Sequence, residues 1–106
     1  MFAIINSKNY VVNNMDTFYK RLKGLMFVKR SIKEIYYFPN CASIHTYFMK
    51  QNIDVCIIDK NNKIIYLKEN VKPNKIIIKN GGKHTLEMPL GICKYLKIGD
   101  TLIIKD

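Results

Sequence analysis

The sequence predicts one mainly-β domain, a small barrel or sandwich of about eight short strands with one or two short helices. Two observations predict this fold class. Short apolar and β-branched runs recur along the chain, separated by turn-forming clusters, and helical spacing of apolar residues is confined to two short stretches. A chain of 106 residues, 48% of them hydrophobic, has the usual size of a single domain with one core. We therefore expect one domain over residues 1–106.

The N-terminal part is predicted to form a hairpin followed by a helix. Residues 3–12 contain two apolar runs around the polar segment 6–9, which favours a β-hairpin with a four-residue loop. Asn14 or Asp16 is a suitable cap for a helix that ends at Gly24. Apolar residues at helical spacing would face the core: Met15, Phe18, Leu22 and Leu25.

The middle of the chain is predicted to be extended. The β-branched and aromatic run 35–38 is expected to be a strand. Residues 43–49 are also expected to be extended, with alternate side chains on one face: His45, Tyr47 and Met49. Residues 53–58 are apolar on both faces, which indicates a central strand covered on both sides. A turn at 59–63 then leads into the returning strand 64–67.

The C-terminal part adds three short strands. Residues 75–79 form an isoleucine run flanked by lysines, a pattern typical of an edge strand, and a turn at 80–82 follows it. A strand is expected at 85–88, before a proline that ends it. Residues 91–96 have the spacing of a helical turn, and a Gly-Asp turn precedes the last strand, 101–104.

Composition narrows the cellular setting. The three cysteines are an odd number without a C-x-x-C pair, so reduced thiols are expected and a disulfide framework is not. No apolar run is long enough for a membrane span, and the N-terminus lacks the basic region of a signal peptide. We therefore expect a cytoplasmic protein without a cofactor.

The net charge of +10 makes a loose anionic partner, such as nucleic acid, one functional alternative. The charge comes almost entirely from lysine, whereas base reading favours the fork of arginine, so specific nucleic-acid recognition is disfavoured. The lysines considered for such a surface are spread along the chain: Lys20, Lys23, Lys29, Lys33, Lys60, Lys63, Lys68, Lys72, Lys75, Lys79 and Lys83.

Several short motifs resemble, in their order, the family named domain of unknown function 192. The matching pieces are Gly24-Leu25-Met26, Ile44-His45-Thr46 with Met49, Ile53-Asp54 with Ile58-Asp59, Pro73, Leu86-Glu87-Met88-Pro89 with Gly91, and Gly99-Asp100. The similarity covers about residues 15–104. It implies a small, mainly-β fold and carries no established activity.

A ligand- or partner-binding module is the favoured function, because small β barrels and sandwiches often hold a ligand on one face or at one mouth. We predict a polar site formed by the 45–54 segment and the strand that contains Glu87. The predicted ligand-binding residues are His45, Tyr47, Lys50, Asp54 and Glu87. The bound partner would be a small molecule or a protein, and the sequence leaves the oligomeric state open.

A small hydrolase-like or metal-dependent enzyme is the alternative. Cys41 and His45 are close enough in sequence to act as nucleophile and base, or to share a metal ion with Glu87. No nucleophile elbow or glycine-rich oxyanion loop accompanies them. A non-enzymatic role is therefore favoured, and Cys41, His45 and Glu87 are carried forward as both catalytic and metal-ligand candidates.

Overall fold

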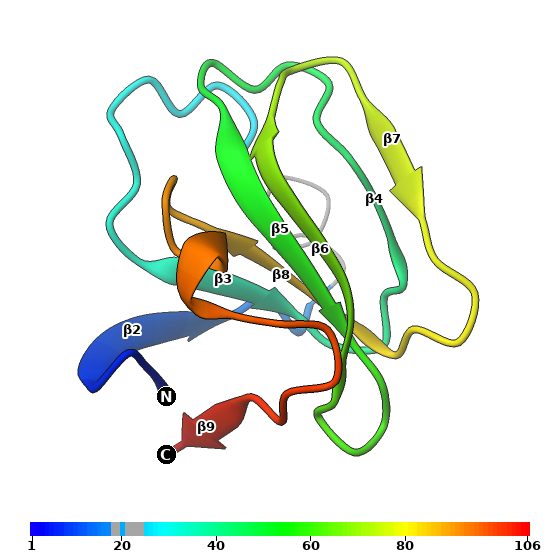
Figure 1. Ribbon diagram of the computed structural model, residues 1–106. Helices are drawn as coiled ribbons and strands as arrows, with labels where there is room; N and C mark the ends of the chain where they lie inside the picture. The colour runs from blue at the N-terminus through cyan, green and yellow to red at the C-terminus, as the bar shows by residue number, and fades with distance from the viewer. Residues whose placement is uncertain (18–19, 21–24) are drawn as a thin grey trace.

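A computed structural model describes residues 1–17, 20 and 25–106 of the chain. This part of the chain contains nine strands and one short 3-10 helix (Figure 1). Their bounds are β1 Phe2–Ile5, β2 Lys8–Asn14, β3 Ile35–Phe38, β4 Ser43–His45, β5 Ile53–Ile58, β6 Ile64–Val71, β7 Ile76–Ile78, β8 His84–Met88, η1 Cys93–Tyr95 and β9 Ile103–Lys105. The mainly-β prediction is confirmed. The helix predicted to end at Gly24 falls mostly on residues 18–19 and 21–24, which lie outside the described residues.

Seven strands form one curled sheet, a half-barrel in the order β6-β5-β8-β3-β2-β1-β9. The β2–β3 pair is parallel and the other neighbouring pairs are antiparallel. An isolated bridge between Lys63 and Thr101 joins the region before β6 to the region before β9. Strands β4 and β7 form a separate two-stranded sheet, which lies beside β6 in Figure 1.

The N-terminal hairpin has a shorter loop than expected. Strands β1 and β2 are joined by only Asn6 and Ser7, whose φ angles are 52° and 62°. Two consecutive left-handed residues are characteristic of a type I′ turn, whose twist matches that of the two strands. The prediction of a hairpin is confirmed, and the predicted four-residue loop is wrong because pairing continues to Ile5 and Lys8.

The central strand is the one predicted from its two apolar faces. Every residue of β5 is buried, and β5 pairs with β6 on one side and β8 on the other. Its two faces contribute to two separate cores. Cys56 and Ile58 pack with Leu86 and Met88 on one face, and Ile53, Val55 and Ile57 pack with Met49 and Val71 on the other. The predicted returning strand is also found, although β6 extends to Val71.

The predicted extension of the chain from 43 to 49 is wrong beyond β4. The chain turns directly after His45, where the N–H of Met49 donates to the carbonyl of Thr46 at 3.3 Å. Phe48 has a φ of 64° in this turn. Alternation of polar and apolar residues suggested a strand, but the turn lets Thr46 and Met49 enter the interior while Tyr47 and Phe48 remain exposed.

Candidate functional site

Asp54 lies in the interior, where its carboxylate accepts hydrogen bonds from three backbone N–H groups. Its side chain is 1% exposed. One carboxylate oxygen accepts a hydrogen bond from the N–H of Asn70 at 3.0 Å. The other accepts from the N–H groups of Gly91 and Cys93 at 3.0 and 2.9 Å. Asp54 therefore connects the end of β6 to the segment that begins η1, and three backbone donors offset the cost of burying the carboxylate.

Glu87 is buried on the opposite face of the same sheet. In the β5–β8 register Asp54 pairs with Met88 and Val55 with Glu87, and paired residues share a face. Glu87 is 4% exposed, and burial raises its pKa to about 8. A row of side chains crosses this face from Lys68 on β6 through Val55 and Glu87 to Tyr36 on β3.

The other predicted ligand-binding residues lie at the surface. His45 ends β4, and its Nδ1 accepts a hydrogen bond from the N–H of Tyr47 at 3.3 Å. The two rings are 5.4 Å apart. Tyr47 and Lys50 are exposed in the loop after β4. The five predicted residues thus occupy three places: the surface, and the two opposite faces of the main sheet.

The catalytic and metal candidates are not gathered either. The thiol of Cys41 donates to the carbonyl of Ser43 at 2.9 Å. Within the part of the chain that the structure describes, no three His, Cys, Asp or Glu side chains are grouped as metal ligands. The remaining cysteines are buried, and burial raises the pKa of Cys56 to about 12 and also raises that of Cys93. The thiols of Cys56 and Cys93 therefore lack the thiolate character that nucleophilic chemistry needs.

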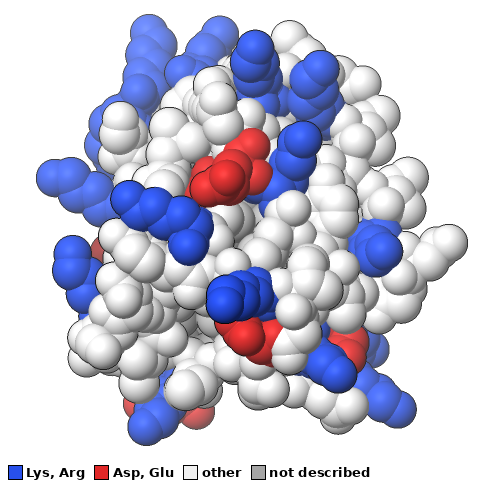
Figure 2. Space-filling model, viewed as in Figure 1, with Lys and Arg blue, Asp and Glu red and all other residues white. Residues whose placement is uncertain are grey.

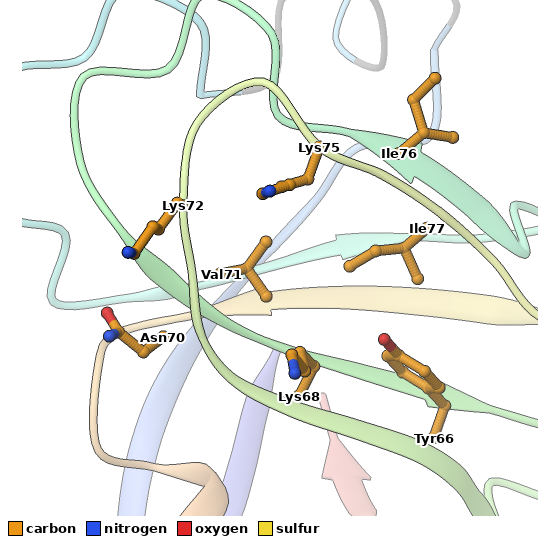
Figure 3. A pocket seen from close by; sticks show the side chains of 8 residues that line it. All are labelled: Tyr66, Lys68, Asn70, Val71, Lys72, Lys75, Ile76 and Ile77. Carbon is orange, nitrogen blue, oxygen red and sulfur yellow. The ribbon is translucent and has the colours of Figure 1, made fainter.

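A groove of about 480 Å³ lies between β6 and the start of β7 (Figure 3). This volume is within the usual range for small-molecule sites. The lining residues are Tyr66, Lys68, Asn70, Val71, Lys72, Lys75, Ile76 and Ile77. We call this the lysine groove. Its lining combines three ammonium groups with apolar and aromatic side chains, and none of these eight described residues is acidic. Such a surface attracts anions.

Thr46 fixes the groove wall that contains two of these lysines. Thr46 is 1% exposed, and its hydroxyl donates to the carbonyl of Lys72 at 2.7 Å and accepts from the N–H of Lys75 at 2.8 Å. The backbone of Thr46 adds two bonds, from its N–H to the Lys75 carbonyl at 2.8 Å and to its carbonyl from the Asn74 N–H at 3.1 Å. One buried threonine therefore holds the bend between β6 and β7.

Asp54 fixes the other end of the same wall. Its carboxylate accepts a hydrogen bond of 3.0 Å from the N–H of Asn70, a residue with a φ of 54°. The side-chain oxygen of Asn70 also accepts from the amide of Asn52 at 2.8 Å. The wall from Asn70 to Lys75 is thus held at both ends by buried side chains, which lowers the conformational cost of binding a ligand there.

The groove was not predicted from the sequence as a site. Its three lysines were included only in the spread of basic residues considered for a loose anionic partner. A signal was nevertheless present, because the motif that contains Thr46 and Pro73 in the following connection both belong to the resemblance described above. What the sequence lacks is the long-range contact between Thr46 and the 72–75 bend.

Similarity to known proteins identifies the family of this chain. The model of DUF192, with the description "Uncharacterized ACR", matches residues 2–104. The chain belongs to the DUF192 family. Among curated DUF192-like relatives, a UPF0127 protein of Thermococcus sibiricus is 35% identical over 94 residues, which is 82% of this chain and 61% of that protein. A UPF0127 protein of Pyrococcus furiosus is also 35% identical over 94 residues, covering 82% of this chain and 80% of that one. The match thus spans less than two thirds of the Thermococcus sibiricus relative.

Two crystal structures share the DUF192 fold described here. A protein from Sinorhizobium meliloti is similar with a TM-score of 0.81 and 20% identity, over 96% of this chain and 89% of that one. A protein of unknown function from Novosphingobium aromaticivorans is similar with a TM-score of 0.79 and 18% identity, over 97% and 82%. At these identities the likeness concerns the fold alone. Within the described residues, no helix is long and apolar enough to cross a membrane.

Proposed function

We propose that this DUF192 domain is a binding module that holds a small anionic ligand in the lysine groove. The single observation that carries the proposal is the bracing of the groove wall. Thr46 and Asp54, each 1% exposed, fix the segment that contains Lys72 and Lys75 through a hydroxyl and a carboxylate. Phosphate and carboxylate groups are the ligands that lysine binds as a point charge. The apolar side chains beside the lysines would contact the uncharged part of the ligand.

The site proposed from the sequence is revised accordingly. Asp54 keeps its place in the proposal as a residue that shapes the groove from the interior, while Lys68, Lys72 and Lys75 supply the charge. Glu87 lies on the same face as Lys68, separated from it in the cross-strand row by Val55. His45 is opposite Ile76, a groove residue, in the β4–β7 pair.

Chemical shifts followed by NMR test this proposal directly. Orthophosphate, citrate and ATP are titrated separately at low ionic strength into the wild-type protein. We expect at least one of them to shift the amide signals of residues 70–77 and to saturate. A rise in salt should weaken this binding, since exposed ammonium groups are screened.

A matched pair of variants separates the groove from the general charge. The double variant Lys72→Ala/Lys75→Ala removes two groove lysines, and Lys60→Ala/Lys63→Ala removes two exposed lysines from the β5–β6 turn. The first should weaken binding by about tenfold or more, the cost of losing roughly 1.4 kcal/mol, and the second should change it little. Equal losses in the two variants, or the absence of saturable binding at low salt, would refute the proposal.

A further inference from the structure

One end of the molecule combines exposed aromatic rings with a row of basic residues. Phe27 and Phe48 are 61% and 58% exposed, their ring centroids are 5.6 Å apart, and the N–H of Phe27 donates to the carbonyl of Phe48 at 2.9 Å. Both residues have a φ of 64°. A left-handed conformation is an outlier for a bulky side chain and persists where the surrounding structure imposes it. The fold therefore holds two phenyl rings together in solvent.

Three loops build this end. Gln51 ties the 46–52 loop to the 25–32 loop, since its amide donates to the carbonyls of Val28 and Arg30 and its oxygen accepts from the N–H of Ile32. Thr46 ties the same loop to the 72–75 bend. In Figure 1 all three loops lie at the upper end of the molecule. We call this end the aromatic tip.

The aromatic tip has charge of one sign only. Residues 25–32, 46–52 and 72–75 contain no acidic residue and five basic ones: Lys29, Arg30, Lys50, Lys72 and Lys75. Figure 2 shows basic side chains gathered along the upper rim in the same view. A second copy of this chain would bring like charges together if it docked here through the same surface, so self-association is disfavoured and an anionic partner is favoured.

Exposed aliphatic groups continue the apolar surface beside the tip. Ile76 and Ile78 on β7 are 61% and 72% exposed, opposite His45 and Ser43 on the outer face of the small sheet. The ring of His45 is adjacent to that of Tyr47, which precedes Phe48. Isoleucine has no ring on which a base could stack, whereas aliphatic and phenyl groups both enter the boundary between lipid headgroups and acyl chains. The mixture therefore favours a lipid surface over nucleic acid.

We propose that the aromatic tip docks on the surface of an anionic lipid bilayer. Phe27 and Phe48 enter the headgroup boundary, and the five basic residues of the three loops face lipid phosphates. Lys72 and Lys75 belong to both the tip and the lysine groove, whereas neither phenylalanine lines the groove, so variants of Phe27 and Phe48 test the docking separately from the proposed groove ligand. Membrane association through one apolar and one electrostatic signal is reversible and salt-sensitive.

A single-tryptophan reporter tests the docking, since the chain has no tryptophan. Phe48→Trp places the probe in the tip, and Phe2→Trp places it on β1 at a residue that is 45% exposed. With vesicles of phosphatidylcholine and phosphatidylglycerol, we expect the Phe48→Trp emission to shift to shorter wavelength and to be quenched by brominated lipid. The Phe2→Trp emission should change little, and vesicles of phosphatidylcholine alone should have little effect on either.

Sedimentation with the same vesicles gives the second measurement. Phe27→Ser and Phe48→Ser should each weaken binding by about tenfold or more, because each removes one phenyl group that the bilayer would bury. Lys50→Gln should weaken it severalfold, and Leu90→Ser, which changes another exposed apolar residue, should not. The proposal is overturned if neither reporter responds to anionic vesicles, if both respond equally, or if single-stranded DNA shifts the Phe48→Trp emission while vesicles do not.

Discussion

The hydroxyl of Thr46 and the carbonyl oxygen of Lys72 form a hydrogen bond of 2.7 Å between the turn after β4 and the bend after β6. The same hydroxyl accepts from the N–H of Lys75 at 2.8 Å. The residues are 26 and 29 positions apart in sequence, so this contact is part of the tertiary fold. It links the shape of the lysine groove to one buried side chain.

Replacing Thr46 tests this link. Thr46→Val keeps the side-chain shape but leaves the Lys72 carbonyl and the Lys75 N–H without their partner. We expect the free energy of unfolding, measured by urea denaturation, to fall by about 2 to 3 kcal/mol. The Lys75 amide should also lose protection from hydrogen exchange. Thr101→Val, at an exposed position, serves as the control. Unchanged protection of the Lys75 amide would show that the bend is held by other contacts.

Replacing Asp54 tests the opposite end of the groove wall. Asp54→Asn leaves one oxygen acceptor for three backbone donors and introduces an N–H₂ group where acceptors are needed. The free energy of unfolding should fall by about 3 kcal/mol, because hydrogen bonds to a charged group are the stronger ones. Alkylation of native Cys93 should become faster, since its backbone N–H loses its partner. Burial and the negative charge of Asp54 both raise the pKa of the thiol, and the variant removes that charge.

Two results would contradict this interpretation of Asp54. One is an unfolding free energy equal to that of Asp106→Asn, which changes an exposed carboxylate. The other is a Cys93 alkylation rate that stays at the wild-type level while Cys41 reacts normally. Either result would mean that the carboxylate contributes little to holding the η1 segment.

Most strands could be predicted from local sequence patterns, because the alternation of apolar and polar residues that marks a strand involves only residues that are neighbours in sequence. Residues 53–58 are apolar on both faces, and this alone indicated a strand covered on both sides. Asp59 explains the hairpin that follows, since its side chain accepts hydrogen bonds from the N–H groups of Asn61 and Lys63. These bonds lower the pKa of Asp59, as carboxylates bonded to backbone donors usually show.

The candidate site could not be predicted because it depends on register and long-range contacts. Asp54 and Glu87 are both acidic and both belong to the resemblance motifs, yet the β5–β8 register puts them on opposite faces. Strand β8 lies between β5 and β3, and β2 runs parallel to β3, neither of which periodicity indicates. The groove lysines look like any other lysines until Thr46 is seen to hold their backbone.

Glu87 should give this protein a distinctive dependence of stability on pH. Its folded-state pKa is about 8, above the ordinary value of 4.5, because burial penalises the charged form. Between these values the folded state binds more protons than the unfolded state. The contribution of Glu87 to the free energy of unfolding is therefore fully present below about pH 4.5 and is lost as the pH rises toward 8, at a rate of up to about 1.4 kcal/mol per pH unit.

Glu87→Gln removes this titration while keeping the size of the side chain. Urea denaturation at a series of pH values should show the free energy of unfolding of the variant increasing relative to that of the wild type as the pH rises. The difference should be largest above the pKa of about 8. Glu69→Gln, on the exposed part of β6, should follow the wild-type curve. If the Glu87→Gln and wild-type curves run parallel over this range, the carboxyl group of Glu87 is already ionised in the folded protein, and a cation or hydrogen-bond donors must compensate for its burial.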